Sequence, residues 1–473
     1  MQNKKIKERE FMKKILSKIL VAVICVITVF SLAACAPAWS GFSNSVQDET
    51  INGGIAVKHD GYLYFINGTK STSETANQGN IVKGAIYRIE LGEDGEVEFD
   101  EDDKTVKTPE KVVNALVGFK NGSIHIFGNY LYYATTSNRV NESDEVLFGQ
   151  IEFARYDIKS GNSETFYTTK KSNDTISYAY YLNDDKIDFV IFEKNSATLT
   201  SLSISDKIET NFVKDEITGA LMGENFGVSE KTTTGNVVDD ADCYVYYTKA
   251  ANPDGEIVDG NRVYFASSDG EFDELLSERN EVVSLFSVTC GKLIYTVDSY
   301  IYADNIDKDS RSLSYNPDDL STVISFLTYE EDGEQLMFVD RNGELAVLVY
   351  TGSEIKWVDW SDYPNFDPDD TVYNFGDSDT KVEFVGVEGD YLYFTRDKKL
   401  NKIKVLNTTV QESPIALTST TFDAASDLMV TKLMDGYAYG FVTSSSNAYL
   451  YRVSLADPTG SEVEAGKFIG VKE

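Results

Sequence analysis

The feature that most constrains this chain is a turn followed by a strand of alternating aromatic residues, which occurs eight times in its 473 residues. Clear copies include Gly61-Tyr-Leu-Tyr-Phe65, Gly128-Asn-Tyr-Leu-Tyr-Tyr133 and Gly389-Asp-Tyr-Leu-Tyr-Phe394. The first strand residues of the eight copies are 62, 130, 186, 244, 292, 335, 391 and 437, with a mean step of about 54 residues. Eight such units account for nearly all of the chain beyond residue 50. A single core of this size would be too large, so a repeat architecture is favoured.

Four strands can be drawn around each copy. In the second unit the expected strands are 123–127, 130–135, 152–158 and 164–168, and in the seventh they are 381–387, 391–395, 400–405 and 414–418. A lone four-stranded sheet exposes both of its faces to water. When such sheets stack radially, each sheet covers the apolar faces of its neighbours and the assembly is stable. The sequence therefore predicts an all-β fold, a single β-propeller of eight four-stranded blades. Seven blades is the alternative if the degenerate third copy is an insertion, and two stacked β-sandwich domains are the rival architecture.

The repeats also resemble a known family. Their strands end in pieces such as Tyr393-Phe394-Thr395-Arg396-Asp397 and Tyr247-Thr248-Lys249. These look like the repeats of a propeller family of unknown function that is common in lipoproteins of Gram-positive anaerobes and is distantly similar to YWTD propellers. The resemblance covers essentially the whole mature chain and implies a propeller at the cell surface, without known catalytic residues. Every copy lacks the Trp of the YWTD motif, which argues against a receptor-like role.

The N-terminal region has the pattern of an export signal. Residues 1–34 carry seven basic residues and end in the uncharged apolar run 19–34, and Leu32-Ala33-Ala34-Cys35 resembles the lipobox of bacterial lipoproteins. We therefore expect a signal peptide at 1–34, a lipidated Cys35 with a polar tether to residue 50, and the propeller at 51–473. The protein would then be anchored to the outer face of the cell membrane. A simple secretory signal or a single anchor helix is the alternative, and Met12 could be the true start.

The net charge limits the partners that the chain can bind, and the cysteine content limits its disulfides. The formal net charge of −34 excludes nucleic acid, because phosphate binding needs a basic face. The lipid is thus the expected contact with the membrane, and an envelope protein or a glycan is the expected further partner of a monomeric chain. Cys243 and Cys290 either form one disulfide or remain two buried thiols.

Sequence motifs for catalysis are absent. There is no GxGxxG, GxxxxGK[ST] or GxSxG motif, and His59 and His125 are the only histidines. We expect His59 to be an exposed turn residue and His125 to pack between blades. Residues 93–103 hold eight acidic side chains and should form a solvated loop. No cofactor is expected, although the acidic runs 93–103, 305–309 and 377–379 have the oxygen ligands that Ca²⁺ prefers.

One aromatic stretch is not explained by the repeat. It runs from Trp357 through Trp360 and Tyr363 to Tyr373 and Phe375, between the sixth and seventh units. Rings mixed with carboxylates are typical of surfaces that bind sugars or proteins, so Trp360, Tyr363 and Tyr373 are the candidate ligand-binding residues. The alternative is structural: Trp357 would end a blade strand and Trp360 would pack beneath the loop.

These features predict a surface-anchored lipoprotein that acts as a binding or scaffold module and is not an enzyme. The alternative is a carbohydrate-active enzyme, a glycosidase or lyase, with two or three carboxylates at the propeller axis. A third interpretation is an assembly lipoprotein with a broad apolar patch on one face.

Overall fold

The structure of the chain is a computed structural model. It describes residues 53–69, 80–117, 123–136, 149–172, 174–183, 186–204, 209–222, 244–251, 257–271, 273–277, 283–289, 292–297, 300–307, 312–314, 323–325, 335–341, 344–359, 371–376, 382–396, 399–407, 412–418, 426–444, 447–458 and 466–472. The chain divides into two compact units, 1–45 and 46–473, and every described residue belongs to the second. The predicted signal, Cys35 and the polar tether lie outside the described ranges.

The described strands pair into antiparallel sheets, which we number in chain order. Sheets 1 to 4 consist of β1 (Ala56–His59), β2 (Tyr62–Ile66), β3 (Ile86–Glu90) and β4 (Glu110–Val113); β5 (Ile124–Phe127), β6 (Tyr130–Thr136), β7 (Ile151–Asp157) and β8 (Ser163–Thr168); β9 (Ile176–Asn183), β10 (Lys186–Glu193), β11 (Thr198–Ser203) and β12 (Glu209–Asp215); β13 (Ile217–Met222), β14 (Tyr244–Ala251), β15 (Ile257–Ser267) and β16 (Asp273–Ser277).

The second half of the chain continues the pattern. Sheets 5 to 8 consist of β17 (Val283–Thr289), β18 (Lys292–Val297), β19 (Tyr300–Asp307) and β20 (Ser312–Ser314), with β21 (Val323–Ser325) also paired to β19; β22 (Gln335–Arg341), β23 (Glu344–Tyr350), β24 (Glu354–Asp359) and β25 (Thr371–Asn374); β26 (Val382–Glu388), β27 (Tyr391–Arg396), β28 (Lys399–Lys404) and β29 (Ile415–Ala416); β30 (Ser426–Met434), β31 (Tyr437–Ser444), β32 (Asn447–Ser454) and β33 (Lys467–Phe468).

The fold is all-β, as predicted, and it is a β-propeller. None of the described residues is helical, so these ranges contain no helix with the length and apolar character needed to cross a bilayer. The described strands form eight sheets, one for each predicted unit. Several connecting segments lie outside the described ranges, and the number of blades in the complete ring stays a prediction.

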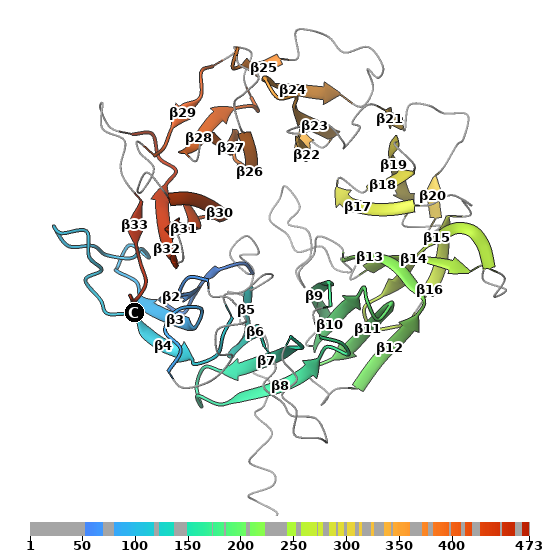
Figure 1. Cartoon of the computed structure of the whole chain (residues 1–473), viewed down its shortest axis with the longest axis horizontal. Coiled ribbons are helices and arrows are strands. Elements are labelled where there is room, and N and C mark those ends of the chain that lie inside the picture. The colour runs from blue at the N-terminus through green and yellow to red at the C-terminus, as the bar shows by residue number, and fades with distance from the viewer. Residues whose placement is uncertain are drawn as a thin grey trace, which may run out of the picture. The chain divides into compact units, whose positions relative to one another are not determined.

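The sheets follow one another around a centre, with the first strand of each sheet innermost (Figure 1). Contacts between first strands join sheet 1 to sheet 2 and link sheets 3 through 8 in order. Sheets 2 and 3 meet through aromatic side chains, since Phe153 lies 4.9 Å from Tyr178 and 4.7 Å from Phe189 between ring centroids. Sheets 8 and 1 are joined by side-chain hydrogen bonds described below. Each sheet is built from strands that are consecutive in the chain, so the described ladders of the first and last sheets share no strand.

The repeated sequence forms the hairpin between the first and second strands. In sheet 1 the turn consists of Asp60 and Gly61, with φ of 47° and 77°, and in sheet 8 of Asp435 and Gly436, with φ of 50° and 76°. Two consecutive residues with positive φ make the tight hairpin turn that matches the twist of paired strands, which is why Asp-Gly recurs here. In β2 the side chains of residues 63 to 66 are all buried, because adjacent sheets cover both faces.

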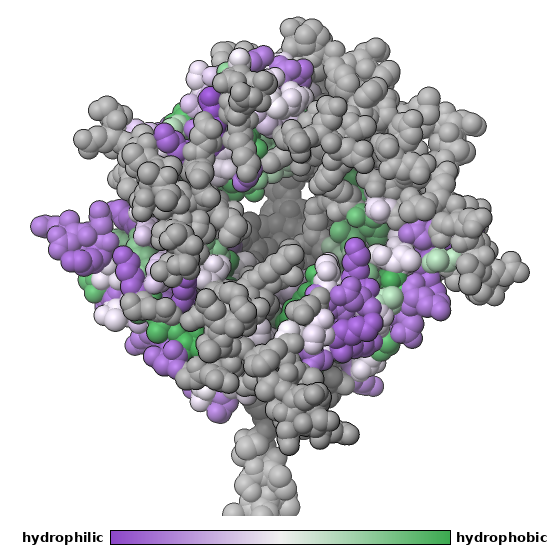
Figure 2. All heavy atoms as spheres, viewed as in Figure 1, coloured by the Kyte–Doolittle hydropathy of each residue, from purple (hydrophilic) through white to green (hydrophobic). Residues whose placement is uncertain are grey.

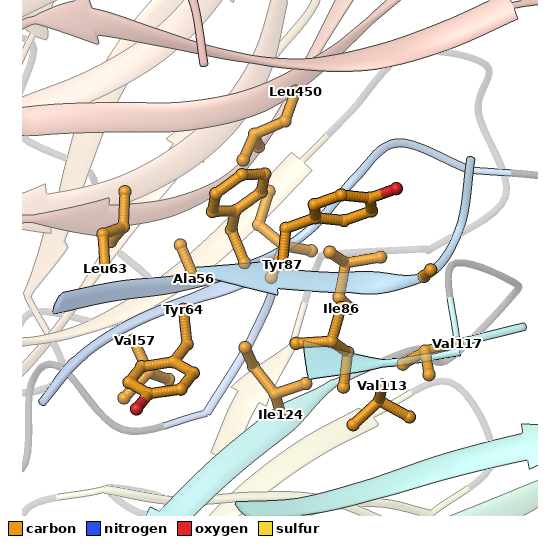
Figure 3. Packing of buried hydrophobic residues seen from close by; sticks show 14 of the residues in the cluster. Ala56, Val57, Leu63, Tyr64, Ile86, Tyr87, Val113, Val117, Ile124 and Leu450 are labelled. Carbon is orange, nitrogen blue, oxygen red and sulfur yellow. The ribbon is translucent and has the colours of Figure 1, made fainter. Parts of the chain in front are cut away.

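The core consists of layers between neighbouring sheets. In Figure 3, Leu63, Ala56 and Tyr87 lie on the side of sheet 1 that faces Leu450 of sheet 8, whereas Tyr64 lies on the opposite side. All belong to one buried cluster that links sheets 8, 1 and 2. On the face shown in Figure 2, hydrophilic residues gather at the rim and hydrophobic residues appear between the sheets. This layered burial is the mutual cover that makes four-stranded sheets stable.

The predicted strands can be compared with those observed. In sheets 2 and 7 the eight predicted strands are confirmed, with most ends within one or two residues. In the sixth unit a strand was expected to begin at residue 335, and β22 does begin there. It is the first strand of sheet 6, whereas the same phrase forms the second strand of sheets 2 and 7. The second strand of sheet 6 is β23, Glu344–Tyr350.

Candidate functional site

The predicted recognition residues lie between the last two strands of sheet 6. Trp360 and Tyr363 are outside the described residues, whereas Tyr373 lies in β25 and is half-buried. Its ring is 4.9 Å from that of Phe375 in a T-shaped arrangement, and both rings pack on the buried cluster that joins sheets 6 and 7. The structure therefore places Tyr373 at the base of the segment.

The strand that precedes segment 360–370 is also held by packing. Trp357 lies in β24 and is 5% exposed, and the Arg341 guanidinium lies over its ring at 4.8 Å. This part of the structural alternative is confirmed: Trp357 belongs to a blade strand. Segment 360–370 thus connects β24, where Trp357 is buried, to β25, where the half-buried Tyr373 packs on Phe375.

A second arrangement, which the sequence did not reveal, is a repeated tyrosine–cation pair. A tyrosine at the start of the second strand is covered by an Arg or Lys from the third strand, in sheets 7, 8, 1 and 2. The distances from the cation to the ring centroid are 4.7 Å for Lys402 and Tyr391, 4.2 Å for Arg452 and Tyr437, 4.6 Å for Arg88 and Tyr62, and 4.7 Å for Arg155 and Tyr130. In each sheet the cation is paired across the ladder with the tyrosine two residues further along the second strand. Such contacts stabilise by about 0.5–1 kcal/mol each at exposed sites.

The four cations differ in what they bind beyond the ring. Arg88 and Arg155 each pair with a glutamate of their own sheet that is more than 60% exposed. Lys402, by contrast, donates a 2.6 Å hydrogen bond to the Leu455 carbonyl of the next sheet. Arg452 also binds across sheets. The sequence signal, a basic residue in the third strand after Tyr-x-Tyr, is obscured because the intervening loop varies in length.

The contacts between sheets 8 and 1 form what we call the closing junction, made by Asn67, Glu96, Lys432 and Arg452. Arg452 donates 2.9 Å hydrogen bonds to Glu96 and to the Val97 carbonyl. Glu96 also accepts a 2.7 Å bond from Lys58, whose ammonium lies 3.0 Å from Asp435. Two basic and two acidic groups from both ends of the ring therefore neutralise one another.

The Asn67 side chain completes the closing junction. Its amide nitrogen donates to the Val471 carbonyl at 2.8 Å, and its oxygen accepts from the Val471 amide at 2.8 Å. It donates a further 3.0 Å bond to the Val82 carbonyl. An ideal Cβ at Gly470 would overlap the Asn67 oxygen, so only glycine fits beside this bidentate contact.

A different network joins sheets 3 and 4, which we call the third–fourth junction, made by Asp188, Ser201, Asn211 and Ser268. The Asp188 carboxylate is 2% exposed and accepts bonds from Asn211 at 3.0 Å and from the Ser268 hydroxyl at 2.9 Å. Asn211 and the Ser201 hydroxyl both donate to the Ser268 carbonyl. Hydroxyl and amide groups thus satisfy the buried carboxylate.

The two histidines occupy different environments. His125 is 2% exposed in β5, with its ring 4.9 Å from that of Tyr180 in sheet 3, which confirms the prediction that it packs between blades. Burial, with a smaller contribution from Lys432, lowers the pKa of His125 to about 3. The prediction for His59 was wrong: it is the last residue of β1 and is half-buried, with Nε2 3.3 Å from Asp60. Burial lowers the pKa of His59, and Asp60 partly offsets the shift.

The acidic residues of the sequence between β3 and β4 are mostly exposed. Segment 91–109 joins β3 to β4, and its carboxylates are exposed apart from that of Glu96, as expected for a solvated loop. Within the described ranges no group of three or more His, Cys, Asp or Glu side chains could hold a metal ion. Asp309, Asp377, Asp379, Cys243 and Cys290 lie outside the described residues.

The pKa of one carboxyl group, that of Glu388, is shifted. Burial and the neighbouring Asp435 carboxylate raise the pKa of Glu388, which ends β26, while a hydrogen bond from the Gly436 backbone partly opposes the shift. Carboxyl pairs with split pKa values are used by glycosidases. Here Asp435 is paired with Lys58 across the ends of the ring, and Glu388 approaches it from sheet 7.

Comparison with known proteins finds only a distant likeness to solved structures. No protein-family model matches the chain, and no curated protein matches it. Among solved structures, the β-propeller domain of the Trilobed protease from Pyrococcus furiosus is 13% identical, with 83% of this chain and 96% of that chain covered and a TM-score of 0.30. The WD40 domain of SCAP from fission yeast is 10% identical, with 82% and 97% covered and a TM-score of 0.39.

A peptidase gives a similar result over part of its length. A structure from a study of two prolyl endopeptidases is 14% identical, with 70% of this chain covered and a TM-score of 0.37. The chain spans about half the length of that peptidase, 49%. Likeness at this level concerns the fold alone.

Proposed function

We propose that this chain is an extracytoplasmic lipoprotein whose propeller acts as a ligand- or protein-binding module. Signal removal before Cys35 and acylation of that residue would hold it at the outer face of the membrane. The acidic ring would then stand away from anionic lipid and wall polymer, since like charges repel. A glycan or an envelope protein is the proposed partner.

The observation that carries this proposal is the anchoring of segment 360–370. The strands at its two ends are held by the Trp357–Arg341 and Tyr373–Phe375 contacts, while the segment itself contributes Trp360, Tyr363 and several carboxylates. A two-stranded connection can be made with two residues, so eleven are far more than the hairpin needs. Long loops on a rigid scaffold are typical recognition elements.

The test is a binding screen of the mature chain, residues 36–473, against glycans and envelope proteins. For any ligand found, the double variant Trp360→Ala and Tyr363→Ala should lose at least tenfold in affinity, because aromatic anchors dominate such interfaces. Val213→Ala is the matched control, since Val213 is 52% exposed in sheet 3 and should leave affinity unchanged. Equal affinity of the double variant and the parent chain, with both folded, would refute the role of the segment.

A further inference from the structure

One lysine of the closing junction, Lys432, binds the segment that leads into sheet 1. Lys432 lies in β30, and its ammonium donates hydrogen bonds to the Gly53 carbonyl and, at 2.7 Å, to the Ala56 carbonyl. Gly53 is where the described chain enters sheet 1, and Ala56 is the first residue of β1. Because the described ladders of sheets 1 and 8 share no strand, side-chain bonds of this kind replace a ladder.

The segment that Lys432 binds is held on its other side by sheet 2. The Gly54 amide donates to the Ser123 hydroxyl at 2.8 Å, and the Gly54 carbonyl accepts from the Ile124 amide at 2.9 Å. Gly53 and Gly54 have φ of 83° and 71°, which glycine adopts without strain. A Cβ on Gly53 would lie 3.0 Å from His125 Nε2, and one on Gly54 would lie 3.2 Å from Lys432 Cδ. The two glycines thus fill a narrow space between sheets 2 and 8.

Few charges face the ammonium in this space. His125 approaches from β5, and Asp435 from the turn after β30, where it is paired with Lys58 of β1 at 3.0 Å. Glu388, at the end of β26, interacts with Asp435. Burial therefore outweighs the attraction of Asp435, and the pKa of Lys432 falls from 10.5 to about 7. His125, with a pKa of about 3, is neutral throughout the neutral range.

We propose that Lys432 is a proton-operated clasp that sets how tightly the first and last sheets of the ring are joined. When the junction opens, Lys432 enters water and regains its ordinary affinity for a proton. Opening of the junction is therefore accompanied by proton uptake at pH values that lie between the pKa of Lys432 in the closed form and its higher pKa in the open form. Rising pH above neutral favours the closed junction, and below neutral the clasp contributes no further pH dependence. A neutral amine retains two N–H donors, which suffice for the two carbonyls.

The first experiment measures Lys432 in the unaltered full chain. Competitive acylation with trace reagent, followed by peptide mass spectrometry, gives the reactivity of each lysine against pH. Reactivity of Lys432 should reach its plateau near pH 7 to 8. Lys104, whose side chain is 72% exposed, provides the reference profile measured in the same sample. A Lys432 profile that coincides with that of Lys104 would overturn the proposal.

The second experiment tests the clasp itself. Hydrogen exchange of the amides in 53–57 and 430–434, corrected for intrinsic rates, should slow by up to tenfold per pH unit from pH 7 to 9. Lys432→Met keeps the chain length and removes the titrating group, so this extra slowing should vanish, while amides of the third–fourth junction follow the parent chain. Persistence of the slope in the variant, or its absence in the parent chain, would contradict the proposal.

Discussion

The closing junction and the third–fourth junction each hold two sheets together, but they use different kinds of hydrogen-bonding groups. Asp188 and Ser268 are 80 residues apart, and neutral hydroxyl and amide donors surround the one carboxylate. Asn67 and Val471 are 404 residues apart, and Arg452 and Val97 are 355 apart, and here cations and a bidentate amide bind main-chain groups. The entropic cost of closing the longer loop is greater by about 1.5 kcal/mol, roughly the net value of one good hydrogen bond.

The comparison shows how position in the chain affects what a junction needs. Neighbouring sheets are brought together by a short connection, so packing plus a local network is sufficient. The first and last sheets have no such connection, and there the cations Lys432 and Arg452 bind main-chain carbonyls of the opposite sheet. Charge-assisted bonds, which are about twice as strong as neutral ones, suit that position.

The largest effect is expected at the third–fourth junction. Asp188→Ala should lower the free energy of unfolding by about 3 kcal/mol, because it leaves Asn211 and Ser268 with buried donors unsatisfied. Urea unfolding measures this. Asp269→Ala is the control: Asp269 accepts bonds from Ser267 and Glu271 at a half-buried turn, and its loss should cost less than about 1 kcal/mol. Equal losses would show that the buried network is not the source of stability there.

An intermediate effect is expected where the chain end meets Asn67. Gly470→Ala should cost about 2 kcal/mol, because the new methyl group displaces the Asn67 amide from Val471. Gly386→Ala is the matched control, since its Cβ would meet Leu433 at an ordinary 3.4 Å. Hydrogen exchange should speed up at the closing junction alone. If it accelerates in sheets 3 and 4 as well, the two junctions are coupled and the comparison above fails.

The smallest effect on stability is expected for two arginines, Arg452 and Arg155, that occupy equivalent positions in the third strands of sheets 8 and 2. Arg452→Met should cost about 1.5 kcal/mol, because Arg452 binds Glu96 and Val97 of the opposite sheet while 7% exposed. Arg155→Met should cost about 0.5 kcal/mol, because its partner Glu164 is 63% exposed and belongs to the same sheet. Thermal unfolding of both variants measures the difference, and an Arg155 loss as large as that of Arg452 would remove the distinction between them.

Much of the fold could be predicted because the information is local. The Asp-Gly turns and the alternating aromatics mark the hairpin of each sheet, and strands such as β6 and β27 begin at the predicted residue, Tyr130 and Tyr391. In the sixth unit the strand predicted at residue 335 is β22, the first strand of its sheet, whereas in sheets 2 and 7 the repeated phrase forms the second strand. Local pattern reports burial and does not say which inner strand a segment becomes.

The junction contacts could not be predicted for the same reason. Asn67 meets Val471, and Lys432 meets Gly53, only after the ring has formed, and neither pair leaves a spacing signal in the sequence. The tyrosine–cation pairs were within reach, because Tyr62, Tyr130, Tyr391 and Tyr437 all belong to the repeated phrase. Their cations come from a third strand whose distance along the chain ranges from 11 to 26 residues, which hides the repeat. Of the predicted recognition residues, Tyr373 is the one within the described ranges; it lies in strand β25 and packs on Phe375 and the cluster that joins sheets 6 and 7, and its role in ligand binding stays a prediction.

The position of Gly53 and Gly54 has a mechanical consequence. A pull on the preceding chain would not simply unzip β1 from β2, because Gly53 is bonded to β30 through Lys432 and Gly54 is bonded to Ser123 and Ile124 of sheet 2. The load would be divided among three sheets at once. Bonds loaded in parallel must yield together, so these contacts should resist tension applied through the chain that precedes Gly53.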